Sequence, residues 1–145
     1  MTDTLTLNGQ VLGQAERATR ALLEVLLAET GTPFEQWVTI NLVHAEGGSI
    51  DEADLVQRLA SGLRIDGEAA LDVVGALRSP ALLQTADDAR CVELTAAGAA
   101  RHDRIRAGID QITERLYGDV AHDDLVTAGR VLTLVTERAK AELAR

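Results

Sequence analysis

The sequence predicts a mainly α-helical fold that carries one small β-hairpin. Aromatic residues make up only 2% of the 145 residues, so the core must be built from Leu, Val, Ile and Ala. These side chains favour packed helices over an aromatic-rich sheet. Apolar residues recur every three or four positions along most of the chain, whereas the strong strand signal is confined to the region around "CVEL", Cys91 to Leu94. A chain of this length can bury about 70% of its surface as one domain.

The composition of the chain limits the cellular compartments and the binding partners that we expect for it. The first ten residues, "MTDTLTLNGQ", have neither the basic nor the apolar part of a leader, and no stretch approaches 18 apolar residues. We therefore expect a cytoplasmic protein without a membrane segment. Cys91 is the only cysteine, which excludes an internal disulfide. We expect it to be buried and to pack as a small apolar side chain. The net charge of −9 opposes phosphate binding in general.

Helix signals define the first two elements. Leucines at helical spacing predict a long helix from Gly9 to Glu29. A second helix is predicted from Pro33 to about His44. Its N-cap is Thr32, its first helical residue is Pro33, and Glu35 completes a capping box.

Two shorter helices are predicted next. Ser49 and Glu52 repeat the capping-box pattern and predict a helix from Ile50 to Ser61. Asp66 is placed as the N-cap of the following helix, Gly67 to Leu77, whose apolar residues recur at helical spacing. Three short helices in a row therefore precede the strand region.

The hairpin is predicted from two short apolar segments. Residues 82–85 and 91–94 can pair as antiparallel strands around the loop Ala86 to Arg90. Val92 and Leu94 then lie on one side of the second strand and Glu93 on the other. The hairpin is expected directly after the third short helix.

Two long helices complete the chain. Isoleucine and leucine at spacings of four, three and four between positions 105 and 116 predict the first. Asp119 is placed as the N-cap of the last helix, which runs to about Leu143. The predicted order is one long helix, three short helices, a hairpin and two long helices. This is the order of a winged helix-turn-helix with long flanking helices for dimerisation.

With these elements the chain resembles the MarR family of bacterial transcriptional regulators. The resemblance is carried by "FEQWVTINLV", "LVQRLASGLRID", "ALDVVGALRSPALL" and "CVELTAAGAARHDRI", and it covers nearly the whole chain. It implies one domain over residues 1–145, with a winged helix-turn-helix at 33–95 and dimerisation helices at 1–30 and 96–145. It also implies a homodimer that binds double-stranded DNA through a recognition helix and a wing, and that releases DNA when a small molecule binds.

The expected DNA-binding surface is unusually acidic. By the resemblance, Gly67 to Leu77 is the recognition helix, and its charged groove-facing residues are Glu68 and Asp72, which can only accept hydrogen bonds from a cytosine amine. Residues 45–95 hold ten acidic residues and four arginines. These arginines are the candidate phosphate or minor-groove contacts: Arg58, Arg64, Arg78 and Arg90. The alternative is that Arg78 complements a helix dipole and the others are solvated surface charges.

A ligand pocket is expected near the few aromatic residues. Phe34, Trp37 and Tyr117 could contact a small aromatic acid, and the polar group that orients it could come from Arg17, Arg20 or His102. The alternative for Phe34 and Trp37 is an ordinary place in the core.

The sequence shows no catalytic, cofactor or metal motif. His44, His102 and His122 could act as general bases, but no histidine has a second ligand four residues away. His102 and Asp103 are adjacent on a predicted helix and are expected to point in different directions. Two functions therefore remain: a ligand-responsive DNA-binding regulator, or a protein of this fold that has lost DNA binding and serves as a ligand-binding, protein-interaction or catalytic module.

Overall fold

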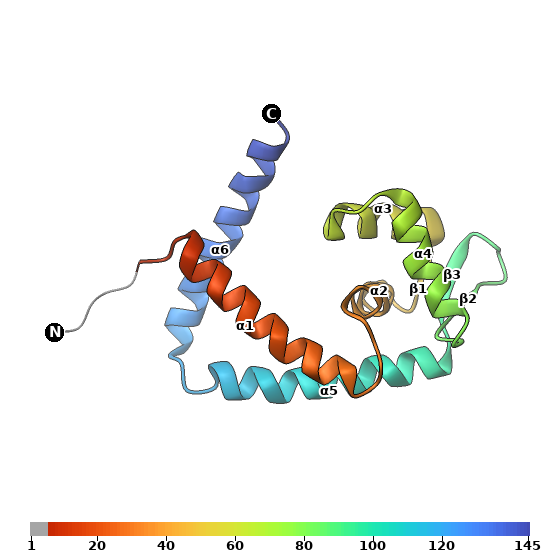
Figure 1. The fold of residues 1–145 in the computed structure, drawn as a ribbon, viewed down its shortest axis with the longest axis horizontal. Helices are drawn as coiled ribbons and strands as arrows, with labels where there is room; N and C mark the ends of the chain where they lie inside the picture. Colours follow the sequence, from red (N-terminus) through yellow and green to blue (C-terminus); the bar gives the residue numbers. More distant parts are fainter. Residues whose placement is uncertain (1–5) are drawn as a thin grey trace. The chain divides into compact units, whose positions relative to one another are not determined.

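The computed structural model describes residues 6–145, and it divides into two compact units. The first ends at Asp110, and the second comprises Gln111–Arg145 (Figure 1). The elements in chain order are α1 (Gly9–Ala28), α2 (Phe34–Ala45), β1 (Ser49–Asp51), α3 (Glu52–Leu63), α4 (Gly67–Arg78), β2 (Leu83–Thr85), β3 (Cys91–Leu94), α5 (Ala96–Tyr117) and α6 (His122–Leu143). The predicted mainly helical fold with a small hairpin is confirmed.

Hydrophobicity along the helices is too low for a bilayer span. Within residues 6–145, every helix is too short or too polar to cross a membrane. The prediction made for the first ten residues falls partly on residues 1–5, which lie outside the described part of the chain.

Helix N-caps were predicted with mixed success. Asp66 caps α4 as expected, because its Oδ1 accepts from the Ala69 N–H at 2.7 Å. The prediction for α2 was wrong: Pro33 itself holds the N-cap position, and the hydroxyl of Thr32 pairs with that of Thr30 at 2.8 Å. The last helix also begins later than predicted, after Ala121, and it has no side-chain cap from Asp119.

A third strand was missed. Ser49–Asp51 pairs antiparallel with β3 and places Ile50 opposite Val92, so the sheet has the order β1-β3-β2. Ser49 is therefore a strand residue and not a helix cap. Asp51 caps α3 instead, since its Oδ1 accepts from the backbone of Ala53 at 2.9 Å. The predicted hairpin is confirmed, although its first strand begins at Leu83.

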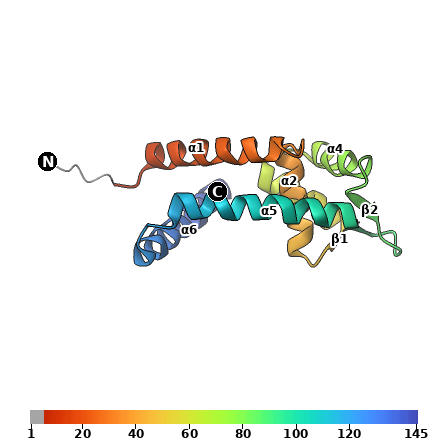
Figure 2. The ribbon, with the colours of Figure 1, turned by 90° about the horizontal axis from the view of Figure 1, so that it is seen from below.

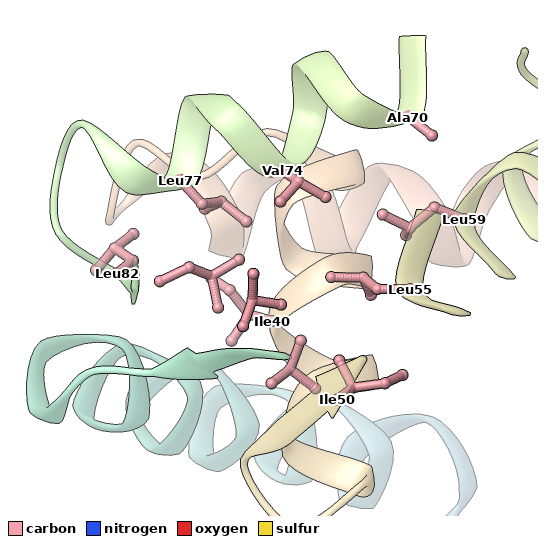
Figure 3. Packing of buried hydrophobic residues seen from close by; sticks show 11 residues of the cluster. Ile40, Ile50, Leu55, Leu59, Ala70, Val74, Leu77 and Leu82 are labelled. Carbon is pink, nitrogen blue, oxygen red and sulfur yellow. The ribbon is translucent and has the colours of Figure 1, made fainter. Parts of the chain in front are cut away.

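The main core lies where α2, α3, α4 and the sheet meet. It is made of eleven buried aliphatic side chains, most of which Figure 3 labels. Ile40 of α2, Leu55 of α3 and Val74 of α4 have no exposed surface. Burial of this set is the dominant favourable contribution to forming the helix-turn-helix, at roughly 25 cal/mol per Å² of apolar area.

A second, smaller core joins α1, α2 and α5 within the first unit. It consists of Leu27, Trp37 and Ile105, and Figure 2 shows the end of α1 beside α5. Because Ile40 and Trp37 both belong to α2, this helix contributes to both cores. Trp37 therefore occupies a place in the core, which was the alternative to its prediction as a ligand contact. In the second unit, α6 buries no side chain.

Candidate nucleic-acid interface and ligand pocket

The exposed face of α4 carries negative charge. Glu68 and Asp72 are exposed, and between them Leu71 is 51% exposed. The remaining exposed positions before the last turn are Gly67, Gly75 and Ala76, which bring no charge. No basic side chain therefore lies on this face, and a helix that meets a DNA groove this way presents carboxylates to phosphates.

Two of the four candidate arginines are held by ion pairs inside the protein. Nη1 of Arg58 lies 2.7 Å from Oε1 of Glu46, and Nη2 of Arg78 lies 3.0 Å from Oε1 of Glu52. These carboxylates neutralise the guanidinium charges locally. A phosphate that approaches either arginine meets a guanidinium whose charge is already partly offset by the neighbouring carboxylate, which weakens both as DNA contacts.

The other two candidates are exposed and make no ion pair with any residue from 6 to 145. Arg64 ends α3 in the left-handed conformation, with φ of 55°, in the turn that leads to α4. Arg90 lies at the end of the β2–β3 loop, called the wing below. Since neither guanidinium is paired, both can approach a phosphate without first breaking an internal contact.

The wing also holds a tight turn around Asp88. Its Oδ1 accepts from the backbone N–H groups of Cys91 and Arg90, each at 3.0 Å. These two hydrogen bonds lower the pKa of Asp88 below the usual value, so the carboxylate stays ionised beside Arg90. The wing tip therefore carries a fixed negative charge next to its single arginine.

Cys91 is half-buried, which corrects the expectation of a fully buried residue. Its position at the start of β3, beside the wing, leaves part of the side chain at the surface. Burial raises the pKa of the Cys91 thiol, and the charge of Asp88 adds to the shift. The thiolate population at neutral pH is therefore low, which disfavours a role as a reactive thiol.

A pocket of about 440 Å³ lies at the C-terminal end of α1 and the start of α2. The guanidinium carbon of Arg20 sits 3.9 Å from the ring centre of Phe34, and both residues line the pocket. Glu24 lines it as well, 3.6 Å from Nε of Arg20. A cation above an aromatic ring in an open pocket can bind a planar acid.

The other candidate ligand residues do not line this pocket. Trp37 of α2 and His102 of α5 stack on one another instead, with ring centres 5.4 Å apart. Arg17 is exposed on α1 and folds back along its own helix over Gly13. Tyr117 belongs to the second unit.

His102 lies in a cluster that the sequence did not reveal. It is buried, its ring stacks on that of His44 with centres 3.6 Å apart, and its Nδ1 lies 3.3 Å from Oδ1 of Asp103. The expectation that His102 and Asp103 diverge was wrong, because the carboxylate turns back along α5 to the ring. The partners lie 58 positions apart in the chain, so no local pattern could have paired His44 with His102.

Solved structures provide the comparison with known proteins. No family model matches the sequence, and no curated protein matches it. A MarR family transcriptional regulator from Silicibacter pomeroyi shares 21% identity, with 92% of this chain and 90% of that chain covered and a TM-score of 0.76. The reduced form of MarR from E. coli shares 18% identity, with coverages of 91% and 95% and a TM-score of 0.68.

A third structure is that of a protein whose DNA binding is regulated by a small molecule. It is BpsR of Bordetella bronchiseptica, described with a mechanism for regulation of DNA binding by 6-hydroxynicotinic acid. Its identity is 20%, it covers 93% of this chain and 98% of its own, and the TM-score is 0.70. The chain therefore has the winged-helix fold of MarR family regulators.

Proposed function

We propose that this protein is a ligand-responsive transcriptional regulator of the MarR type that binds duplex DNA as a homodimer. The observation that carries the proposal is the complete winged helix-turn-helix, in which α3 and α4 share one core with the sheet that bears the wing. The solved structures with this fold are regulators, which supports the same function here. The fold supplies a helix and a ribbon of the kind that DNA grooves admit.

DNA contact in this proposal depends on Arg64 and Arg90. Both are exposed and unpaired within the described residues, whereas Arg58 and Arg78 are neutralised by Glu46 and Glu52. Glu68 and Asp72 can only accept hydrogen bonds, so their contribution to base recognition is limited to cytosine amines. Binding is therefore dominated by a few phosphate contacts and is strongly salt-dependent.

The test is a mobility-shift titration with duplex DNA from upstream of the protein's own gene. We expect Arg64→Ala and Arg90→Ala each to weaken binding about tenfold, because each removes a phosphate contact on both protomers. Arg58→Ala is the matched control, an exposed arginine in the same region that is already ion-paired, and it should change affinity by less than about threefold. Equal losses for all three variants would contradict the assignment.

The ligand in this proposal is a small aromatic acid in the pocket beside Phe34. Arg20 lines that pocket, and its pairs with Glu16 at 3.8 Å and Glu24 at 3.6 Å are long and exposed, so a ligand carboxylate can replace them with two shorter hydrogen bonds. The regulation of BpsR by 6-hydroxynicotinic acid, itself an aromatic acid, supports this ligand class.

Dimerisation is proposed to use α6 together with α1. Val135 and Leu143 of α6, eight positions apart on one side of the helix, are 42% and 65% exposed and have no partner within their own unit. We expect Val135→Glu to convert a dimer to a monomer in sedimentation equilibrium. Thr133→Glu adds the same charge on the opposite side of the helix and should leave the dimer intact; a monomeric wild type would refute this assembly.

The second candidate is a protein of this fold that no longer binds DNA. The acidic face of α4 and the two ion-paired arginines favour it. A groove of about 460 Å³ between α3 and α4, lined in part by Val56, Ala60 and Leu71, would then contact another molecule. Absence of duplex binding at low salt by a folded dimer would select this candidate.

A further inference from the structure

We infer that His44, His102 and Asp103 form a binding site for a divalent transition metal ion of the zinc type. The three residues come from α2 and α5 within the first unit, and one ligand atom of each lies within 4.8 Å of the others. Two imidazoles and a carboxylate are a common ligand set for Zn²⁺, with water completing the coordination. The inference concerns metal binding alone and does not depend on DNA binding.

His102 is held in the orientation that such a site needs. Its ring is only 4% exposed, and Oδ1 of Asn41 lies 3.1 Å from Nε2. In the neutral tautomer that carries its proton on Nε2, the Nε2–H group donates to Oδ1 of Asn41 and the lone pair of Nδ1 faces Asp103. Metal-bound histidines are oriented in this way by a hydrogen-bond acceptor at the second ring nitrogen.

The space between His102 and Asp103 favours a cation. Nδ1 of His102 and Oδ1 of Asp103 are 3.3 Å apart, and in the neutral ring with its only proton on Nε2 both atoms are acceptors. Two lone pairs that face each other at this distance repel unless a proton or a metal ion lies with them. The exposed carboxylate of Asp103 can shift slightly outward to admit the larger ion.

His44 supplies the third ligand after a change of side-chain rotamer. Its ring is stacked almost parallel to that of His102, at an angle of 11°, so the two in-plane lone pairs do not converge as they stand. His44 is exposed in the last turn of α2, so its ring can leave the stack on His102 toward solvent. Because one ligand atom of each residue already lies within 4.8 Å of the others, the site requires only a rotation of this side chain and no movement of either helix.

Metal binding would tie α2 to α5. Ile40 and Val43 of α2 belong to the core of the winged helix-turn-helix, whereas Trp37 belongs to the smaller core with Ile105 of α5. Trp37 and Ile105 already join α2 to α5, and an ion held by His44 on one helix and by Asp103 on the other adds a further connection between them. We therefore expect Zn²⁺ to raise the thermal stability of the protein.

The test is calorimetric titration of ZnCl₂ into the full chain, freed of any affinity tag and pretreated with a chelator. We expect one ion per chain, with His44→Gln and Asp103→Asn each weakening binding at least about tenfold. Both residues are exposed, so these variants should fold, which circular dichroism checks. The matched control is His122→Gln, an exposed histidine of α6, which should bind Zn²⁺ as the wild type does.

Two results would overturn the site. One is a folded wild type that takes up no Zn²⁺ and gains no thermal stability from it. The other is a double variant, His44→Gln with Asp103→Asn, that binds Zn²⁺ as tightly as the wild type. Ca²⁺ and Mg²⁺ should not compete, because these ions prefer sites made wholly of oxygen ligands.

Discussion

Replacing Gly98 with alanine is expected to destabilise the protein by about 3 kcal/mol. A Cβ at this buried position would lie 2.2 Å from the carbonyl oxygen of Leu82 and 3.1 Å from Cδ2 of Leu94. The first of these atoms is backbone, and that carbonyl accepts the N–H of Thr95 at 3.1 Å, so it cannot move without losing a hydrogen bond. Thermal unfolding should show a melting temperature lower by about 10 °C.

The matched control is Gly129→Ala in α6. A Cβ at Gly129 meets no atom within 4 Å, and the site is an exposed helix interior. Alanine favours helix over glycine by about 1 kcal/mol, so this variant should melt at the same temperature or higher. If both variants lose the same stability, the close contact between Gly98 of α5 and the Leu82 carbonyl is not the cause of the loss at Gly98.

Removing the negative charge on α4 is expected to strengthen DNA binding. In the proposed dimer, the double variant Glu68→Gln with Asp72→Asn removes four carboxylates, two from each copy of α4. Because both side chains are exposed on the face offered to the groove, we expect affinity for a duplex of random sequence to rise about tenfold at low salt. Fluorescence anisotropy with a labelled duplex measures this change directly.

The control changes net charge by the same amount elsewhere. Glu114→Gln with Asp123→Asn removes two exposed acids outside α3, α4 and the wing. Long-range repulsion falls equally in the two double variants, so any excess gain for the α4 variant reports its local contact with DNA. Equal gains would mean that α4 does not face the duplex.

Local signals accounted for most of the fold. Asp66 followed by apolar residues at helical spacing specified α4, and the alternation in Cys91–Leu94 specified β3. Strand β1 was missed because Ser49 to Glu52 has the spacing of a capping box, and only pairing with β3, about 40 residues later, makes these residues a strand. Short edge strands depend on partners that local sequence does not contain.

The site was harder to predict than the fold for the same reason. The acidity of the α4 face was readable from Glu68 and Asp72, since a helix fixes which positions are exposed. The ion pair between Arg78 and Glu52, which lies 26 positions away, could not be predicted from the sequence. Such pairs arise from the packing of α3 against α4, which brings together side chains that no periodicity connects.

The most direct measurement of the central claim is the salt dependence of duplex binding by the wild-type protein, for which a homodimer is proposed. Two free arginines per protomer, Arg64 and Arg90, give four phosphate contacts, so log affinity should fall against log salt with a slope of about −3.6. If a folded dimer shows no duplex binding even at low salt, the proposal of a DNA-binding regulator is contradicted. The second candidate, a protein of this fold that has lost DNA binding, would then remain. A slope near twice this value would contradict the internal pairing of Arg58 and Arg78.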